Sequence, residues 1–286
     1  MTPPAHAIST CRPRSLAAAA CALLLGLAVL APAQAGEGPW TQAQNARARL
    51  IEGGPASAPG SILAGVQIQI EPGWKTYWRY PGDAGVPPRF DWSGSSNVAS
   101  AQVLWPAPKR FSDPSGTYIG YEKEVIFPVE IQLQKPGEPA RLDLNIEYAV
   151  CKDICIPVES RLQASFDGKD ADATTPLVKS YVKKVPHKLA LSAGGKVFRR
   201  IEATLSGPRP VLAVDVAAEG NSDLFVEAPD GLYLPLPADE GLQKDGSRRF
   251  TVDLAQSGNP ASLKGRILRL TLETGADAYE AEWRVE

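Results

Sequence analysis

The sequence predicts an all-β protein with two consecutive β-sandwiches. Apolar and polar residues alternate over many short runs, turn-forming residues separate these runs, and only one segment carries the signals of a helix. Short strands without interleaved helices are typical of sandwiches. We therefore expect a leader over residues 1–35, a first sandwich over 36–166, a linker with a short helix over 167–196, and a second, smaller sandwich over 197–286.

The leader resembles an export signal. Arg12 and Arg14 form a basic start, residues 16–31 form an apolar run, and residues 33–35 form a small-residue cleavage site. We expect cleavage before Gly36. Because the apolar run is shorter than the roughly 20 residues of a membrane-spanning helix and no other long apolar run follows, the sequence predicts a soluble mature chain.

Composition argues against several classes of function. Without the leader, the chain keeps two cysteines (Cys151 and Cys155), one histidine (His187) and no methionine. Two thiolates fall short of the four ligands of a structural zinc site, so we expect neither a metal nor another cofactor. A Ser-His-Asp triad would depend on His187, which we expect to be exposed in the linker. The 30 basic and 32 acidic residues form no charge blocks, so nucleic acid is not an expected partner.

The first sandwich is predicted to contain several short strands ahead of the cysteines. Their expected positions are residues 42–50, 62–70, 90–92, 103–105 and 125–133. The aromatic stretch Trp74 to Tyr80 fits the packing of a sandwich and its rim better than the alternative, a platform that stacks sugars or bases. Segment 106–122 is rich in proline, glycine and serine, and we expect a long, lid-like loop that carries Phe111, Tyr118 and Tyr121.

The cysteines lie in the turn of a predicted β-hairpin. Residues 141–150 and 156–166 alternate between apolar and polar, and pairing the last residue of the first run with the first residue of the second brings the apolar faces together. In this register Cys151 and Cys155 face each other on the polar side, within the Cα separation that a disulfide tolerates. Because Ile154 is unfavourable in the left-handed position of a three-residue loop, a single helical turn is the alternative.

The cysteine pair has two interpretations. As a structural staple, a disulfide that closes so short a ring would contribute only about 2 kcal/mol to the stability of the fold. A domain of this size also buries a hydrophobic core large enough to be stable without the disulfide. The expected exposure of both thiols, with Lys152 beside the first, is instead the setting of reactive thiols, so we favour a redox pair. Lys152 could favour a thiolate, and Asp153 could relay a proton, although simple solvation is the favoured interpretation for Asp153.

The chain after the first sandwich is predicted to form a helix and then a second set of strands. Thr175 as N-cap and Pro176 as the first helical residue begin the helix, which should end before Pro186. Strands are predicted at residues 197–205, 211–216, 224–227, 248–254, 267–272 and 279–285. Turns at residues 229–231 and 244–246 separate some of them. This sandwich has neither cysteine nor histidine, so we expect a docking or spacer domain.

A family resemblance follows from the cysteine motif. Residues 148–159, YAVCKDICIPVE, resemble the motif of the amino-terminal periplasmic domain of the DsbD thiol:disulfide interchange proteins, especially their ScsB-like branch. Further matching motifs are GWKTYW at 73–78, PG at 81–82, GVPP at 85–88, WP at 105–106 and PV at 128–129. Together these motifs cover about residues 60–166. The motif of DsbD itself has five residues between its cysteines, whereas this chain has three.

The resemblance implies an immunoglobulin-like sandwich in the periplasm, a component of a protein-disulfide reductase. Such a module accepts electrons from a thioredoxin-like domain or protein and passes them to periplasmic protein disulfides. Cys155 would form the mixed disulfides and Cys151 would resolve them, beneath a cap loop with Phe111, Tyr118 and Tyr121. Because the chain stops at Glu286, we expect the membrane electron-transfer protein to be a separate polypeptide.

The alternative function is non-enzymatic. Two immunoglobulin-like domains with a structural disulfide would suit a binding or chaperone-like protein of the periplasm, serving copper-stress or cytochrome maturation systems. Separate replacement of the two cysteines distinguishes the alternatives, because only a redox pair traps an adduct with a partner.

Overall fold

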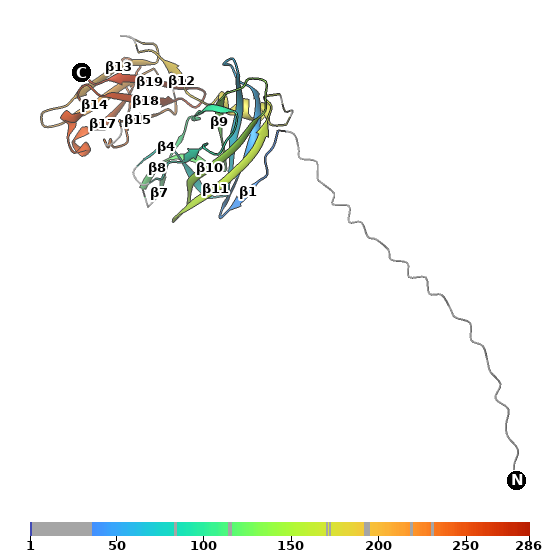
Figure 1. The fold of residues 1–286 in the computed structure, drawn as a ribbon. Helices are drawn as coiled ribbons and strands as arrows, with labels where there is room; N and C mark the ends of the chain where they lie inside the picture. Colours follow the sequence, from blue (N-terminus) through green and yellow to red (C-terminus); the bar gives the residue numbers. More distant parts are fainter. Residues whose placement is uncertain are drawn as a thin grey trace. The chain divides into compact units, whose positions relative to one another are not determined.

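The structure is a computed structural model, and it describes most of the chain beyond residue 35 (Figure 1). The described residues are 1, 36–82, 85–113, 116–169, 171, 173–191, 195–217, 220–229 and 232–286. The chain falls into two units, Met1–Ala33 and Gln34–Glu286, and everything below concerns the second. Apart from Met1, the predicted export signal over residues 1–35 lies outside the described residues, as does most of the predicted turn at 229–231.

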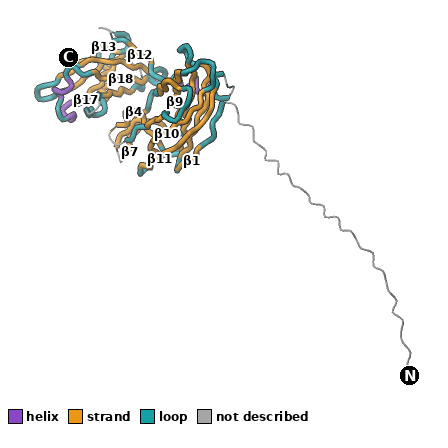
Figure 2. The backbone as a smooth tube through the Cα atoms, in the orientation of Figure 1, coloured by secondary structure: helices purple, strands orange, loops and turns teal. Residues whose placement is uncertain are grey.

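Two antiparallel sheets form the first sandwich. One sheet has the strand order β1 (Thr41–Ala43), β2 (Ala46–Pro55), β3 (Ser61–Ile70), β9 (Glu124–Leu133) and β6 (Val98–Val103). The other has the order β11 (Cys155–Phe166), β10 (Ala140–Cys151), β4 (Lys75–Gly82), β8 (Gly116–Glu122) and β7 (Lys109–Asp113), and β5 (Arg89–Asp91) also pairs with β10. Figure 2 shows strands, in orange, through most of the described chain, as the all-β prediction requires.

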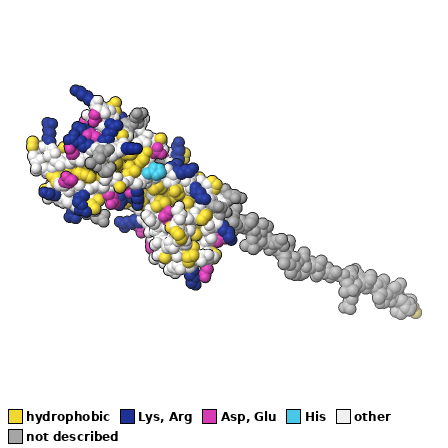
Figure 3. Space-filling model, turned by 90° about the horizontal axis from the view of Figure 1, so that it is seen from above, with side chains coloured by type: hydrophobic (Ala, Val, Ile, Leu, Met, Phe, Trp, Pro, Cys, Tyr) yellow, Lys and Arg dark blue, Asp and Glu magenta, His cyan; other side chains and the backbone are white. Residues whose placement is uncertain are grey.

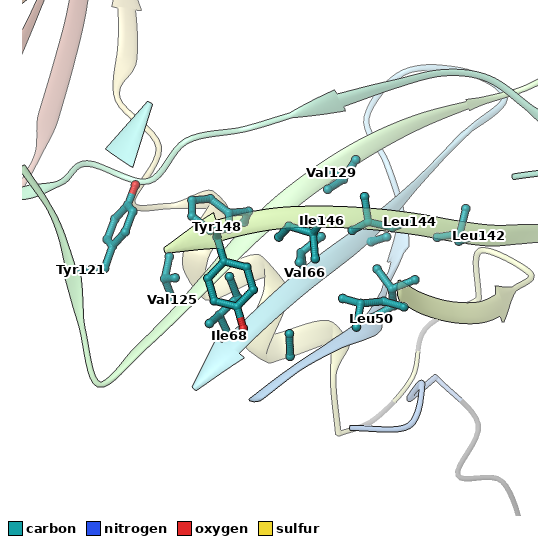
Figure 4. Close-up of a cluster of buried hydrophobic side chains, with 14 of the residues drawn as sticks. Leu50, Val66, Ile68, Tyr121, Val125, Val129, Leu142, Leu144, Ile146 and Tyr148 are labelled. Carbon is teal, nitrogen blue, oxygen red and sulfur yellow. The ribbon is translucent and has the colours of Figure 1, made fainter. Parts of the chain in front are cut away.

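The core of the first sandwich lies between these two sheets. Figure 4 shows side chains of β10 gathered with those of β2, β3, β8 and β9. The labelled members, each at most 9% exposed, are Leu50, Val66, Ile68, Tyr121, Val125, Val129, Leu142, Leu144, Ile146 and Tyr148. Because successive side chains of a strand point to opposite faces, one parity of β10 fills the core and the other faces away from it. The apolar parity predicted for residues 141–150 is therefore confirmed.

The predicted first strand is a hairpin. We expected one strand around residues 42–50, but the chain reverses between β1 and β2, which pair from Thr41 with Ala48 to Ala43 with Ala46. Asn45 lies in this turn with a φ of 60°. Asparagine tolerates this left-handed conformation better than most residues, because its short polar side chain can bond locally.

Segment 106–122, predicted to be a long loop, forms the hairpin of β7 and β8. Prolines and glycines suggested a loop, but Gly120 has another role. A Cβ atom at Gly120 would lie 1.9 Å from the carbonyl oxygen of Thr76, so only glycine lets β8 pair this closely with β4. The structure therefore replaces the expected loop with two strands that extend the sheet of the cysteine hairpin.

The second sandwich also consists of two sheets. One has the order β12 (His187–Leu189), β19 (Ala278–Arg284), β18 (Ile267–Glu273) and β15 (Asp223–Glu227), and the other has the order β13 (Phe198–Thr204), β14 (Val211–Val216), β17 (Arg248–Asp253) and β16 (Ala238–Leu242). The predicted strands are confirmed, each end within one residue. Strands β12 and β16 and the short 3₁₀ helices η1 (Leu254–Ser257) and η2 (Pro260–Leu263) were not predicted.

The linker contains the predicted helix, α1 (Thr175–Val182). The N-cap position is Thr174 rather than Thr175, and its side chain makes no capping hydrogen bond. Val178 packs against Ile51 and other buried residues of the first sandwich. His187 is exposed as expected, but it begins β12 and pairs with β19, so it belongs to the second sandwich. The domain boundaries proposed from the sequence stay a prediction.

The surface of the described chain mixes both signs of charge. Figure 3 shows lysine and arginine side chains among those of aspartate and glutamate on the face that it draws. No helix among the described residues has the length and apolar character needed to cross a membrane.

Candidate functional site

The β10–β11 hairpin places the two cysteines opposite each other. The two strands pair Tyr148 with Val158, Val150 with Ile156 and Cys151 with Cys155, which confirms the predicted register. The intervening residues form bends rather than a helical turn. Cys151 and Cys155 are joined as a disulfide, and their Cα atoms are 4.1 Å apart. The local alternation of the two strands is thus enough to bring the sulfurs together.

The two cysteines differ in exposure. Cys155 is exposed, whereas Cys151 is only 2% exposed. The expectation that both sulfurs face water is therefore wrong for Cys151. Both cysteines do point away from the main core, but over Cys151 the outer face of the sheet is covered by a second, smaller cluster of buried side chains. Of the two cysteines, Cys155 is therefore the one open to solvent.

Three aromatic residues, Tyr77, Phe111 and Tyr118, cover Cys151, and we call them the aromatic cover. The rings of Phe111 and Tyr118 stack with centroids 5.4 Å apart, and Tyr77 meets Tyr118 edge-on at 6.3 Å. The ammonium of Lys75 lies 3.5 Å from the centroid of the Tyr118 ring. A largely buried cation over an aromatic face is worth about 2 kcal/mol, so Lys75 helps to hold the cover in place.

Tyr77 also contacts the exposed sulfur. Its hydroxyl oxygen lies 3.2 Å from Sγ of Cys155. A disulfide sulfur carries no proton, so in the oxidised protein the hydroxyl is the donor. After reduction the same hydroxyl can donate to a Cys155 thiolate, and a hydrogen bond to the charged form favours that form. Tyr77 therefore connects the aromatic cover to the exposed sulfur of the disulfide.

The other residues singled out in the sequence lie around the disulfide in different ways. Phe111 and Tyr118 join Cys151 in one cluster, whereas Tyr121 lies in the main core, where its hydroxyl donates to the carbonyl of Pro106 at 2.8 Å. Burial raises the pKa of the Tyr121 phenol well above its usual value. Tyr121 is thus part of the scaffold beneath the hairpin.

The turn itself is exposed. Lys152 and Asp153 both lie open to solvent, and the side chain of Lys152 extends toward Gly73, where an added Cβ would lie 3.7 Å from its Cε atom. Ile154 is 67% exposed and presents a large apolar side chain next to Cys155. The turn therefore presents both charge and apolar surface to solvent.

Sequence reasoning missed Tyr77 and Lys75 as site residues. Both belong to the aromatic stretch, which we correctly assigned to packing: Trp78 is fully buried and Tyr77 is 2% exposed, so the stretch does not form a stacking platform. The missing information was the pairing of β4, which places Lys75 opposite Cys151. Among the described residues, no group of three or more His, Cys, Asp and Glu side chains could hold a metal.

Comparisons with known proteins match this fold. Residues 47–167 match a family described as thiol:disulfide interchange protein DsbD, N-terminal. The fold is similar to the crystal structure of the N-terminal periplasmic domain of ScsB from Proteus mirabilis, with a TM-score of 0.70 and 20% identity over 88% of this chain and 98% of that chain. A search of curated proteins found no match.

These findings confirm the predicted fold class, an immunoglobulin-like sandwich with the cysteine pair followed by a second, smaller β-sandwich. The structural likeness covers more of the chain than the family match does, and so it includes the second sandwich. Residues 47–167 of this chain therefore match the family of DsbD N-terminal domains, within a fold like that of the ScsB periplasmic domain.

Proposed function

We propose that the chain is a periplasmic thiol:disulfide interchange module. In this proposal it relays electrons from a thioredoxin-like donor, itself reduced by a separate membrane protein, to the disulfides of periplasmic proteins. Cys151 and Cys155 carry the electrons. The observation that supports this function most directly is the unequal exposure of the two bonded sulfurs, one in solvent and one beneath the aromatic cover.

The geometry supports a definite order of steps. A donor thiolate attacks Sγ of Cys155, because this sulfur is the exposed one, and Cys151 leaves as a thiolate. A second donor thiol then attacks the donor's own sulfur in the mixed disulfide and releases the module as a dithiol, with two electrons gained. In the reverse sense, the Cys155 thiolate attacks a substrate disulfide. Cys151 then attacks Sγ of Cys155, the substrate leaves reduced, and the module's disulfide reforms.

The surroundings of the pair suit these steps. The Tyr77 hydroxyl is placed to donate to Cys155 in its thiolate form, which is both the attacking and the leaving species. The aromatic cover keeps Cys151 from outside thiols, so that Cys151 reacts with its neighbour only. Lys152 is exposed, and its effect on a thiolate is small because water screens an exposed charge.

Trapping a mixed disulfide tests the proposal. With Cys151→Ala, a complex formed through Cys155 cannot be resolved. We therefore expect a covalent adduct with a thioredoxin that lacks its own resolving cysteine and carries a thionitrobenzoate group on the other one, which leaves as thionitrobenzoate when Cys155 attacks. The matched variant Cys155→Ala leaves only the buried thiol and should give no adduct. Adducts are detected by non-reducing electrophoresis and should disappear with dithiothreitol.

The same experiment separates the non-enzymatic alternative. If the disulfide is only a staple in a binding or chaperone-like protein, neither variant forms an adduct and both merely lose stability. That result would exclude the interchange function. No observation on the described residues favours the staple, since the closed ring is too short to contribute more than about 2 kcal/mol.

A further inference from the structure

Arg110 joins the β7–β8 hairpin to the second sandwich. It lies on β7 directly before Phe111, a member of the aromatic cover. Its guanidinium donates to both carboxylate oxygens of Asp223 on β15, at 2.9 and 2.7 Å. It also donates to the carbonyl oxygens of Pro237 and Leu224, at 2.9 and 3.2 Å. All of its described acceptors belong to the second sandwich or its loops.

Arg110 is next to Phe111 on β7, so its contacts also influence the position of the aromatic cover. Because successive side chains of a strand point to opposite faces, Arg110 and Phe111 leave β7 on opposite sides. Arg110 reaches β15, whereas Phe111 stacks on Tyr118. In the described sheet β7 is the edge strand, with β8 as its neighbour. The contacts with the second sandwich therefore support a strand that its own sheet holds from one side.

The other end of β15 provides a comparison. There Glu227 accepts from Arg79 of β4, at 2.9 and 2.7 Å. Between the two ends, the ring of Phe225 lies 5.6 Å from that of Trp78. The Arg79 pair thus joins the same two sandwiches, but through β4, which lies inside its sheet between β10 and β8.

We propose that the Arg110–Asp223 pair is a positioning contact through which the second sandwich holds the aromatic cover over Cys151. The proposal rests on the interchange function, because the position of the cover then determines which sulfur a partner reaches. A bidentate guanidinium–carboxylate pair fixes orientation as well as distance. The second sandwich, which has no cysteine, would in this way control access to the disulfide of the first.

Alkylation of a single buried thiol measures the opening of the cover. In the mature chain with Cys155→Ala, Cys151 is the one remaining thiol, and iodoacetamide reaches it only when the cover opens. We expect Arg110→Gln and Asp223→Asn each to raise the alkylation rate of Cys151 about tenfold. This is the change in the opening equilibrium expected when one charge-assisted hydrogen-bonded pair is lost. The charge-exchanged double variant, Arg110→Asp with Asp223→Arg, should bring the rate back toward that of the parent.

Two controls separate positioning from general loosening. Arg249→Gln breaks a bidentate pair with Asp215 inside the second sandwich, and Arg79→Gln breaks the other pair at β15. Both should leave the alkylation rate of Cys151 unchanged. An equal increase with Arg79→Gln, or an unchanged rate with the Arg110 and Asp223 variants, overturns the proposal.

The result is independent of exchange with a partner. If Arg110→Gln fails to fold, Arg110→Lys replaces it, because lysine keeps the positive charge but cannot form the bidentate hydrogen bonds of the guanidinium. The alkylation rate of Cys151 should again rise. Failure of the adduct-trapping experiment removes the interchange function but leaves the alkylation rates as a measure of the cover. Failure of the alkylation experiment removes the positioning role and leaves the adduct result intact.

Discussion

The Tyr77 hydroxyl is the contact whose removal should change the chemistry of Cys155 with the least change to the fold. Tyr77→Phe keeps the ring that covers Cys151 and deletes only the oxygen that lies 3.2 Å from Sγ of Cys155. A hydrogen bond to a charged group contributes about 1.5 kcal/mol. Since every 1.4 kcal/mol corresponds to a factor of about ten, losing this bond should lower the thiolate population of Cys155 about tenfold where the thiolate is the minor form.

The assay uses reduced protein prepared without residues 1–35 and with Cys151→Ala, so that Cys155 is its one thiol. The thiolate population is measured by its ultraviolet absorbance across a pH series, and the rate of alkylation by iodoacetamide follows it independently. Tyr118→Phe removes a hydroxyl from the same cover and serves as the matched control, with no change expected. If Tyr77→Phe and Tyr118→Phe give the same thiolate population as the parent, the hydroxyl does not act on the sulfur and the reasoning is refuted.

Three further predictions concern stability. Reducing the disulfide should cost only about 2 kcal/mol in urea unfolding, and a loss of more than twice that amount would point to a structural role for the bond. Gly120→Ala should destabilise the chain by about 3 kcal/mol or more, because the new Cβ would meet the Thr76 carbonyl oxygen, and a melting temperature equal to that of the parent would contradict the close pairing of β8 with β4. Hydrogen bonds from Arg161 and then Gln163 hold the pKa of Asp143 at about 2, below its usual 3.8. A carboxyl with a depressed folded-state pKa stabilises the fold above its unfolded pKa and loses that contribution as the pH falls through the folded value. The melting temperature should therefore fall between about pH 4 and about pH 2, less steeply for Arg161→Gln, and parallel curves for parent and variant would rule out this ion pair as a source of acid sensitivity.

The pairing of the two strands of the cysteine hairpin, which follow each other directly in the sequence, could be predicted to the residue. The alternation of residues 141–150 and 156–166 specified which residues of β10 and β11 face each other, down to Cys151 opposite Cys155. A slip of one residue would turn every apolar side chain to water, so the pattern permits a single register. The strands that were predicted for the second sandwich likewise begin and end within one residue of their expected positions.

Pairing between distant segments could not be predicted in this way. The segment of β7 and β8 carried loop signals, because Gly120 serves a close approach to β4 that no local pattern reveals. Strand β12 likewise pairs in parallel with β19, some ninety residues later in the chain. Such contacts depend on the packing of the whole domain rather than on residue type or spacing, so sequence reasoning left them out.

The amino-acid pattern alone was therefore sufficient for the all-β class, the cysteine hairpin and the pairing of its two sulfurs, because each follows from side-chain alternation over a few adjacent residues. The burial of Cys151, the contact of Tyr77 with Cys155 and the ion pair between Arg110 and Asp223 emerge only in three dimensions. Each of these depends on strands far apart in the chain being brought side by side, and such an approach is decided by the free energy of the complete fold rather than by any local run of residues.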